Sequence, residues 1–251
     1  MPRAVLTDIE GTLGPVAFVR EVLFPYAAAA LPGFVRHHAG DPRVAAILVD
    51  AARLGGVSDS DLDQVTRCLL DWIAEDAKVT PLKALQGLIW EDGYLGGHFR
   101  APVYPDALDR LRAWHGAGVP VYVYSSGSVR AQELYFAHSE GGDLRRLFSG
   151  FFDTTSGSKQ HPDSYRRIAA VIGFLPQDLI FLSDLTPELD AAAAAGLHTA
   201  WLVRPADNTA DEAQLRLSPH PVVRSFAAID WPGDARRLSP LEGVKRWDLA
   251  G

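Results

Sequence analysis

The residues of this chain that are best suited to chemistry stand near its start, in the stretch Asp8-Ile9-Glu10-Gly11-Thr12. Asp8 and Glu10 are two positions apart, so an extended backbone points both carboxylates to the same side. Gly11 then allows a sharp turn. Two neighbouring anions repel each other and need a cation, usually Mg²⁺ held by oxygen ligands. One carboxylate can attack phosphorus while the metal ion neutralises charge, so the stretch predicts a phosphoryl-transfer site. The alternative is a solvated turn of ordinary loop residues.

Three further residues have side chains that bind phosphate. Ser125 and Ser126 follow another apolar run, and their hydroxyls with the backbone N–H groups after them can hold a phosphate. The alternative for this pair is a simple helix N-cap. Lys159 lies in a loop, where it can bind phosphate and keep Asp8 ionised through its opposite charge. The alternative is a solvated surface lysine.

Two late acidic residues complete the candidate site. Asp184 follows a third apolar run and is the natural partner of Asp8 as an oxygen ligand for Mg²⁺, unless it caps the next helix. Glu188 can brace Lys159 or a metal-bound water, or it is an acid in a first helical turn. Each alternative is reasonable by itself. The joint order of acid pair, serine pair, lysine and acid favours one shared site.

Apolar runs alternate with helical patterns along most of the chain. Four runs predict buried parallel strands: 4–6, 119–124, 179–182 and 199–203. Helices are predicted between them, at 105–115, 128–138, 163–172 and 187–195. This alternation predicts an α/β fold with a right-handed, doubly wound parallel sheet. Ligands bind at the carboxyl ends of the strands in such sheets, where the candidate residues stand.

The domain organisation follows from where this alternation is interrupted. Residues 16–98 show helical periodicity and no comparable strand runs, and we interpret them as a helical cap inserted after the first strand. Residues 1–15 and 99–208 are expected to form the catalytic core. Residues 209–251 are expected to add one strand, near 222–226, and an irregular tail from about 232.

Composition narrows the class of protein. Of the 251 residues, 47% are hydrophobic, which is enough for a core. The net charge is −7 and no basic block stands out, so nucleic-acid binding is not expected. Cys68 is the only cysteine, the N-terminus has no signal-peptide pattern, and the alanine run 191–195 is too short to span a membrane. We expect a cytoplasmic monomer that does not bind membranes.

The order and spacing of the candidate residues resemble those of the haloacid-dehalogenase-like phosphatases. Most members carry Asp-x-Asp-Gly-Thr, and Glu10 at the third position looks like the enolase-phosphatase of methionine salvage. The similarity extends over about residues 4–208. It includes the segments 18–26, 82–90, 122–132, 152–154, 164–169 and 203–205. The chain departs from the family at Leu13-Gly14-Pro15, where a threonine run is common, and at Ser158, where histidine is common.

The resemblance implies a reaction and a set of roles. The substrate would be 2,3-diketo-5-methylthiopentyl 1-phosphate, which is first enolised and then dephosphorylated to an acireductone. Asp8 would be the nucleophile, and Ser125, Ser126 and Lys159 would bind phosphate. Asp8, Asp184 and the backbone carbonyl of Glu10 would hold Mg²⁺. We predict that the Glu10 carboxylate transfers protons, including during enolisation.

The sequence allows alternatives for three cap residues and for the function. Lys83, Gln86 and Trp90 lie about one helical turn apart and either face the substrate or pack inside the cap. A generic small-molecule phosphomonoesterase of the same superfamily is one alternative function, and a catalytically silent phosphometabolite-binding module is another. A phospho-accepting signalling domain uses similar residues but does not need a cap of eighty residues.

Overall fold

The structure is a computed structural model that describes residues 2–229, except residues 76, 78, 206, 208 and 209. Its contacts form two compact units. One comprises the residues up to Val16 and those from Ala101 onward, and the other comprises Ala17–Arg100. The predicted boundaries were 15/16 and 98/99. The irregular tail predicted from about residue 232 lies outside the described residues.

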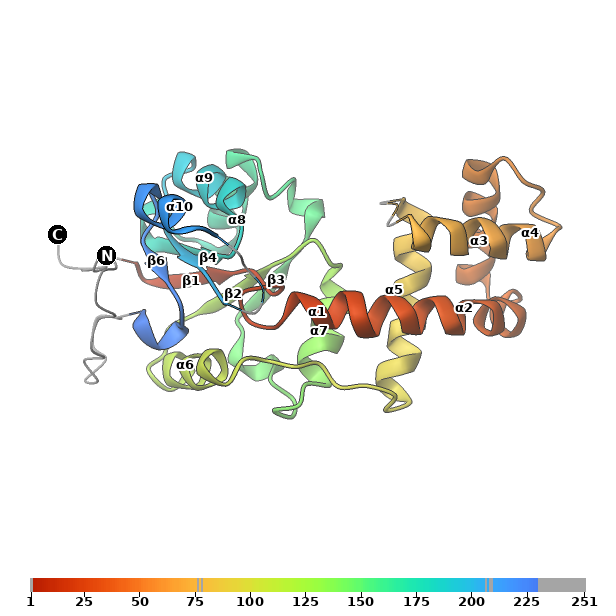
Figure 1. Ribbon diagram of the computed structural model, residues 1–251, viewed down its shortest axis with the longest axis horizontal. Helices are drawn as coiled ribbons and strands as arrows, with labels where there is room; N and C mark the ends of the chain where they lie inside the picture. The colour runs from red at the N-terminus through yellow and green to blue at the C-terminus, as the bar shows by residue number, and fades with distance from the viewer. Residues whose placement is uncertain (1, 76, 78, 206, 208–209, 230–251) are drawn as a thin grey trace. The chain divides into compact units, whose positions relative to one another are not determined.

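The first unit is built on one parallel sheet, with strands in the order β3-β2-β1-β4-β5-β6 (Figure 1). The strands are β1 (Ala4–Thr7), β2 (Val121–Tyr124), β3 (Gly150–Phe152), β4 (Leu179–Ser183), β5 (His198–Leu202) and β6 (Val222–Val223). The predicted α/β fold is therefore confirmed. The strand β3 was not predicted, and β6 is shorter than the strand expected at 222–226.

Helices cover both faces of this sheet. Figure 1 shows α8 and α9 on one face and α6 on the other. The helices are α6 (Pro105–Gly116), α7 (Val129–Ala137), α8 (Pro162–Ile172), α9 (Thr186–Ala194) and α10 (Glu212–Leu217). Short 3₁₀ turns occur at Arg145–Leu147, Thr154–Ser156, Pro176–Asp178 and Phe226–Ala228. Local sequence explains α8, because Pro162 begins it and Gly173, with a φ of 76°, ends it in the left-handed conformation.

The order of the strands determines where in the sheet the candidate site lies. The chain runs outward from β1 to β2 and β3, then returns to the other side of β1 to form β4. Val5 therefore pairs with Val121 on one side and Ile180 on the other. The order of the strands reverses between β1 and β4, and a crevice opens at such a switch point beyond the carboxyl ends of the strands. The residues that follow β1 and β4, Asp8 and Asp184, flank this point.

The second unit is helical, and no strand occurs in the part of it that the structure describes. Its elements are α1 (Val16–Phe18), a π-helical turn (Val19–Leu23), α2 (Phe24–His38), α3 (Pro42–Gly55), α4 (Leu62–Ala74) and α5 (Thr80–Leu95). Asp41 and Asp61 cap α3 and α4 by accepting hydrogen bonds from backbone N–H groups.

The helical stretch 16–38 is long and apolar enough, by length and composition alone, to cross a membrane. Core helices pass the same test. In this chain Ala27, Leu31 and Val35 are fully buried and pack with α3, α4 and α5 in the core of the helical unit. This core therefore accounts for part of the apolar character of the stretch, of which 28% is buried.

Candidate active site

Asp8 is held rigidly at the end of β1. Its backbone N–H donates to the carbonyl of Leu182 on β4 at 2.9 Å, and its carbonyl accepts from the Thr7 hydroxyl at 3.0 Å. The N–H of Ile9 donates to Oδ1 of its carboxylate at 2.8 Å. The side chain is almost fully buried. Strand pairing and side-chain hydrogen bonds therefore fix the direction of this carboxylate.

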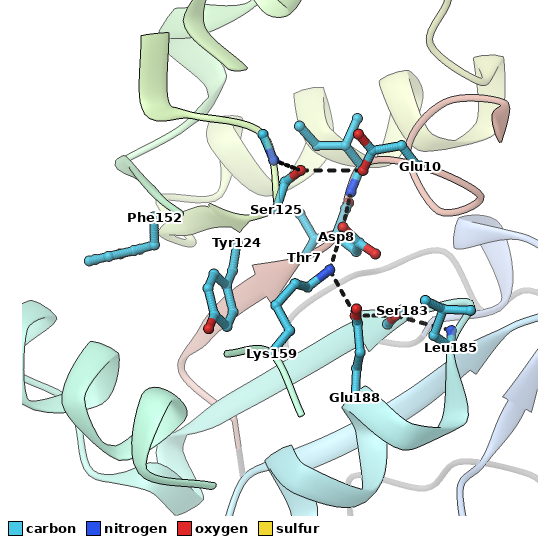
Figure 2. Close-up of polar contacts among 12 residues, drawn as sticks. Thr7, Asp8, Glu10, Tyr124, Ser125, Phe152, Lys159, Ser183, Leu185 and Glu188 are labelled. Carbon is cyan, nitrogen blue, oxygen red and sulfur yellow. Dashed lines mark hydrogen bonds and ion pairs between the residues drawn. The ribbon is translucent and has the colours of Figure 1, made fainter. Parts of the chain in front are cut away.

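Lys159 reaches the same carboxylate from the loop before α8. Its Nζ lies 2.7 Å from Oδ1 of Asp8 and 2.7 Å from Oε2 of Glu188, as Figure 2 shows. Ser183 donates its hydroxyl to the same Glu188 oxygen at 3.0 Å. The predicted brace between Glu188 and Lys159 is thus present. The alternative interpretation of Lys159 as a solvated surface lysine is wrong, since only 6% of the residue is exposed.

The ammonium group of Lys159 stays charged in this setting. Burial acts to lower the pKa of Lys159, but the Asp8 and Glu188 carboxylates outweigh it and raise the pKa above the ordinary lysine value. Both contacts of the Asp8 carboxylate converge on Oδ1. Within the described part of the chain no hydrogen bond reaches Oδ2. That second oxygen is the one available for reaction.

Glu10 faces the serine that follows β2. The hydroxyl of Ser125 donates to Oε2 of Glu10 at 3.3 Å and accepts from the N–H of Gly127 at 3.2 Å (Figure 2). Burial, followed by the nearby Asp8 carboxylate, raises the pKa of Glu10 above its ordinary value, although Lys159 acts in the opposite direction. A carboxyl group with a raised pKa is suited to proton transfer near neutral pH.

The two serines differ in their surroundings. Ser125 is fully buried, whereas Ser126 is exposed. Neither residue caps α7. That position belongs to Ser128, whose hydroxyl accepts from the N–H of Ala131 at 3.2 Å. The N-cap alternative for the pair is therefore wrong, and phosphate binding by Ser126 stays a prediction.

Asp184 lies beside the turn that follows Asp8. A side chain added at Gly11 would place its Cβ only 2.4 Å from Oδ2 of Asp184, and Gly11 has a φ of +69°. The Asp184 backbone carbonyl accepts from the indole N–H of Trp201 at 2.8 Å. The residue before α9 that takes the N-cap position is Leu185, so the interpretation of Asp184 as a helix cap is wrong. Gly11 leaves the space that the Asp184 carboxylate fills.

The charges of this cluster are unbalanced. Burial, followed by the nearby Asp8 and Glu188 carboxylates, raises the pKa of Asp184 to about 7. Burial and Asp8 also raise the pKa of Glu188, against the effect of Lys159. The Lys159 ammonium group is thus the positive charge that faces the buried carboxyl groups of Asp8, Asp184 and Glu188. An additional cation would relieve this repulsion.

A divalent cation with oxygen ligands fits the donor set. No group of three or more His, Cys, Asp or Glu side chains is arranged to hold a metal ion among the described residues. The predicted set, however, contains only two carboxylates, from Asp8 and Asp184, and the backbone carbonyl of Glu10. Mg²⁺ keeps several waters and is usually held by one or two carboxylates together with substrate phosphate oxygens. The donors therefore suit Mg²⁺.

Sequence reasoning missed the aromatic surroundings of Lys159. The ammonium lies 5.9 Å from the ring centroids of Tyr124 and Phe181. The hydroxyl of Tyr165 donates to the Lys159 carbonyl at 2.6 Å. Each of these rings looks like an ordinary core residue in the sequence, and only the packing of α8 against β2 and β4 brings them together.

The helical unit places its three candidate residues in different environments. Lys83 is exposed and Gln86 is buried. Trp90 stacks with Phe24 at 6.2 Å and donates its indole N–H to the carbonyl of Leu23 at 2.9 Å. Trp90 therefore packs within its own unit, as the alternative interpretation had it. A role of this unit as a cap stays a prediction.

Known proteins with related sequences and structures identify the family of this chain. The haloacid dehalogenase-like hydrolase family matches residues 2–196. The chain is 53% identical to enolase-phosphatase E1 of Pseudomonas aeruginosa over 227 residues, which cover 90% of this chain and 97% of that protein. It is 52% identical to enolase-phosphatase E1 of Azotobacter vinelandii over 228 residues, or 91% and 97% of the two chains.

Solved structures show the same architecture. The crystal structure of the UTR4 protein of Saccharomyces cerevisiae superposes with a TM-score of 0.76 at 34% identity, over 91% of this chain and all of that one. CbbY of Rhodobacter sphaeroides, solved in complex with phosphate, has a TM-score of 0.57 at 18% identity, over 90% and 96% of the two chains, which supports the fold alone. The chain belongs to the haloacid dehalogenase-like hydrolases and, within them, to the enolase-phosphatase family.

Proposed function

We propose that this protein is an enolase-phosphatase of methionine salvage that acts on 2,3-diketo-5-methylthiopentyl 1-phosphate. It enolises the diketone and then hydrolyses the phosphate ester, giving the acireductone and inorganic phosphate. The observation that carries the proposal is the contact of Lys159 Nζ with Asp8 Oδ1 at 2.7 Å, which leaves Oδ2 of Asp8 available as a nucleophile. The relatives named enolase-phosphatase E1 support the choice of substrate class.

The hydrolysis takes two steps. Oδ2 of Asp8 attacks phosphorus, the bond from phosphorus to the ester oxygen breaks, and the departing oxygen receives a proton from Glu10. Water then attacks phosphorus, gives a proton to Glu10, and releases inorganic phosphate from Asp8. Lys159 and Ser125 donate hydrogen bonds to the phosphoryl oxygens as their charge grows. Ser126 is proposed to add a further donor.

We propose Mg²⁺ as the cofactor, held by Asp8, Asp184 and the Glu10 carbonyl. When bound, it supplies positive charge that stabilises the phosphoryl oxygens in the transition state. Gly11 contributes by leaving room for the Asp184 carboxylate. The raised pKa of Asp184 supports a cation at this position, because a positive charge would favour the ionised carboxylate.

The test is release of phosphate from the diketone, with Mg²⁺ present or chelated, while the enol is followed by its absorbance. We expect turnover that stops on chelation. Asp8→Asn should lower kcat by at least about 10³-fold, because the nucleophile is lost. Equal activity on common sugar phosphates would favour a generic phosphomonoesterase instead. Ligand binding without turnover by the unmodified protein would favour a binding module.

We propose that the protein works in the cytoplasm as a monomer on a small phosphorylated substrate, without nucleic acid or membrane partners. Sedimentation at micromolar concentration measures the oligomeric state directly, and a dimer would refute the monomer.

A further inference from the structure

The loop that carries Lys159 is held by side chains at four consecutive backbone carbonyls. Arg167 donates to the carbonyl of Ser156. The Tyr124 hydroxyl donates to the carbonyl of Gly157 at 2.9 Å, the Ser164 hydroxyl to that of Ser158 at 2.7 Å, and the Tyr165 hydroxyl to that of Lys159 at 2.6 Å. Loop carbonyls usually bond to water or to other backbone groups. A continuous row of side-chain donors is therefore a specific feature of this loop.

The same tyrosines also belong to the aromatic cluster beside the lysine, which is completed by Phe181. Tyr165 packs edge-on against Tyr124, with ring centroids 5.5 Å apart, and against Phe181, at 5.1 Å. The rings of Tyr124 and Phe181 each lie 5.9 Å from Lys159 Nζ. Tyr124 thus bonds the loop backbone with its hydroxyl and lies near the Lys159 ammonium with its ring. Tyr165 bonds the Lys159 carbonyl with its hydroxyl and packs against both rings that lie near the ammonium.

These contacts suit a lysine that has to stay in one place. A lysine side chain has a flexible four-carbon stem and loses much rotamer freedom when it is fixed. Lys159 sits between two carboxylates, each at 2.7 Å, so a small displacement of its backbone changes both contacts. Burial raises the pKa of both tyrosine hydroxyls, so they remain protonated donors at neutral pH.

We propose that Tyr124 and Tyr165 are positioning residues, which hold the Lys159 loop so that the ammonium group meets both Asp8 and the phosphate of the substrate. This inference rests on the proposed function, in which Lys159 binds the phosphoryl group. The two tyrosines do not touch the reacting atoms themselves. Their effect on catalysis passes through the position of Lys159.

The test compares Tyr124→Phe and Tyr165→Phe with Tyr122→Phe. Tyr122 lies on the same strand and the same face as Tyr124, and the described structure gives its hydroxyl no hydrogen bond. Each variant loses one oxygen atom. We measure kcat on the diketone, the affinity for inorganic phosphate by calorimetry in the presence of Mg²⁺, and the melting temperature. Lys159→Ala provides the reference for complete loss of the ammonium group.

We expect each of the first two substitutions to lower kcat about tenfold and to weaken phosphate binding several-fold, in the direction of Lys159→Ala. The Tyr122→Phe protein should match the unmodified one. Ser164→Ala, which frees the Ser158 carbonyl, should act in the same direction and replaces any tyrosine variant that does not fold.

Two results would overturn the inference. One is phosphate affinity and kcat equal to those of Tyr122→Phe. The other is a lower melting temperature with unchanged phosphate affinity and unchanged kcat per folded molecule, which would show a purely structural role. Phosphate binding needs no turnover. A protein that fails to process the diketone would refute the proposed function and still allow this comparison.

Discussion

Glu10 is the residue whose identity most distinguishes this site from the usual Asp-x-Asp arrangement. Its carboxylate contacts Ser125 at 3.3 Å, and burial and Asp8 raise its pKa. A glutamic acid with these properties can both give and take a proton. We expect Glu10→Gln to lower kcat about 10²- to 10⁴-fold, because the amide keeps the shape of the side chain and cannot transfer protons. The measurement follows enol formation and phosphate release separately.

Glu133→Gln is the matched control, since Glu133 lies on α7 with a side chain that is 40% exposed and that pairs with Arg130 at 3.8 Å. It should leave both steps unchanged. Normal rates of both steps in Glu10→Gln would contradict the role assigned to this carboxylate. Loss of phosphate release with intact enolisation would restrict that role to the ester cleavage.

The sequence allowed residue types to be predicted better than residue environments. The acid pair and Asp184 could be predicted because charged groups at strand ends are unusual and recognisable, and Lys159 because it fits the order of acid pair, serine pair, lysine and acid. Ser125 and Ser126 look alike in the sequence, yet one is buried and the other is exposed. That difference depends on the exact path of the chain after β2, which no local pattern encodes.

At the scale of elements, the turn after β1 leaves room for Asp184, one of the proposed metal ligands. Gly11 has a φ of +69°, and an added Cβ would lie 2.4 Å from Oδ2 of Asp184. We expect Gly11→Ala to weaken Mg²⁺ binding at least tenfold, because the new methyl group displaces this carboxylate. The left-handed backbone should also cost about 1–2 kcal/mol of stability. Calorimetric titration with Mg²⁺ and thermal unfolding measure the two effects.

Gly118→Ala is the control that separates the effect on Mg²⁺ binding from the effect on stability. Gly118 has a φ of +73° and no atom within 4 Å of an added Cβ. It should lose the same stability and keep its Mg²⁺ affinity. Equal Mg²⁺ affinity in both variants would mean that Asp184 is not held against this turn.

Asp106, in the first turn of α6, accepts hydrogen bonds that join distant segments of the chain. Asp106 accepts from Arg204 Nη1 at 3.1 Å, from the Ser225 hydroxyl at 2.8 Å and from the N–H of Phe226 at 2.8 Å. Arg204 in turn donates to the carbonyl of Thr12 at 3.1 Å, in the loop after Glu10. We expect Asp106→Asn to destabilise the protein by about 2–3 kcal/mol at pH 7, because it weakens charge-assisted hydrogen bonds. Denaturant unfolding measures this change.

The stabilisation that Asp106 provides depends on pH. Burial acts to raise the pKa of Asp106, but Ser225, Arg204 and Phe226 outweigh it and lower the pKa below its ordinary value. The stabilisation is therefore present above the unfolded pKa of 3.8 and is lost as the pH falls through the folded value. The gap between Asp106→Asn and the unmodified protein should shrink below about pH 4. Asp163→Asn, at the exposed first turn of α8, should change stability by less than about 0.5 kcal/mol at any pH.

Strongly patterned elements could be predicted from the sequence, and weakly patterned ones could not. The strands β1 and β4 are short apolar runs buried on both faces, and the structure confirms them within one residue. The strand β3 has only the residues Gly150–Phe152, all partly exposed at an edge of the sheet, and its glycine weakens the strand signal. The π-helical turn Val19–Leu23 has no recognised sequence signal.

At the scale of the whole molecule, the site makes the stability of the metal-free protein depend on pH. Burial, Asp8 and Glu188 raise the folded pKa of Asp184 to about 7, above its ordinary value of 3.8. Between these values the folded state binds more protons than the unfolded state, so stability should fall as the pH rises from about 4 to about 7. Mg²⁺ binds the ionised form, and it should stabilise the protein more at pH 8 than at pH 5.

Thermal unfolding measured from pH 5 to pH 8, either with about 10 mM Mg²⁺ or with a chelator, tests this linkage. We expect the melting temperature of the chelated protein to decrease over this range and the Mg²⁺-induced increase to grow. In Asp184→Asn the increase should be small at every pH, because the amide neither titrates nor carries the charge that attracts the cation. A Mg²⁺ effect that is equal at pH 5 and pH 8 in the unmodified protein would show that binding does not displace a proton from this cluster. In that case the carboxylates would already be ionised without the metal, and their repulsion would have to be balanced by Lys159 alone.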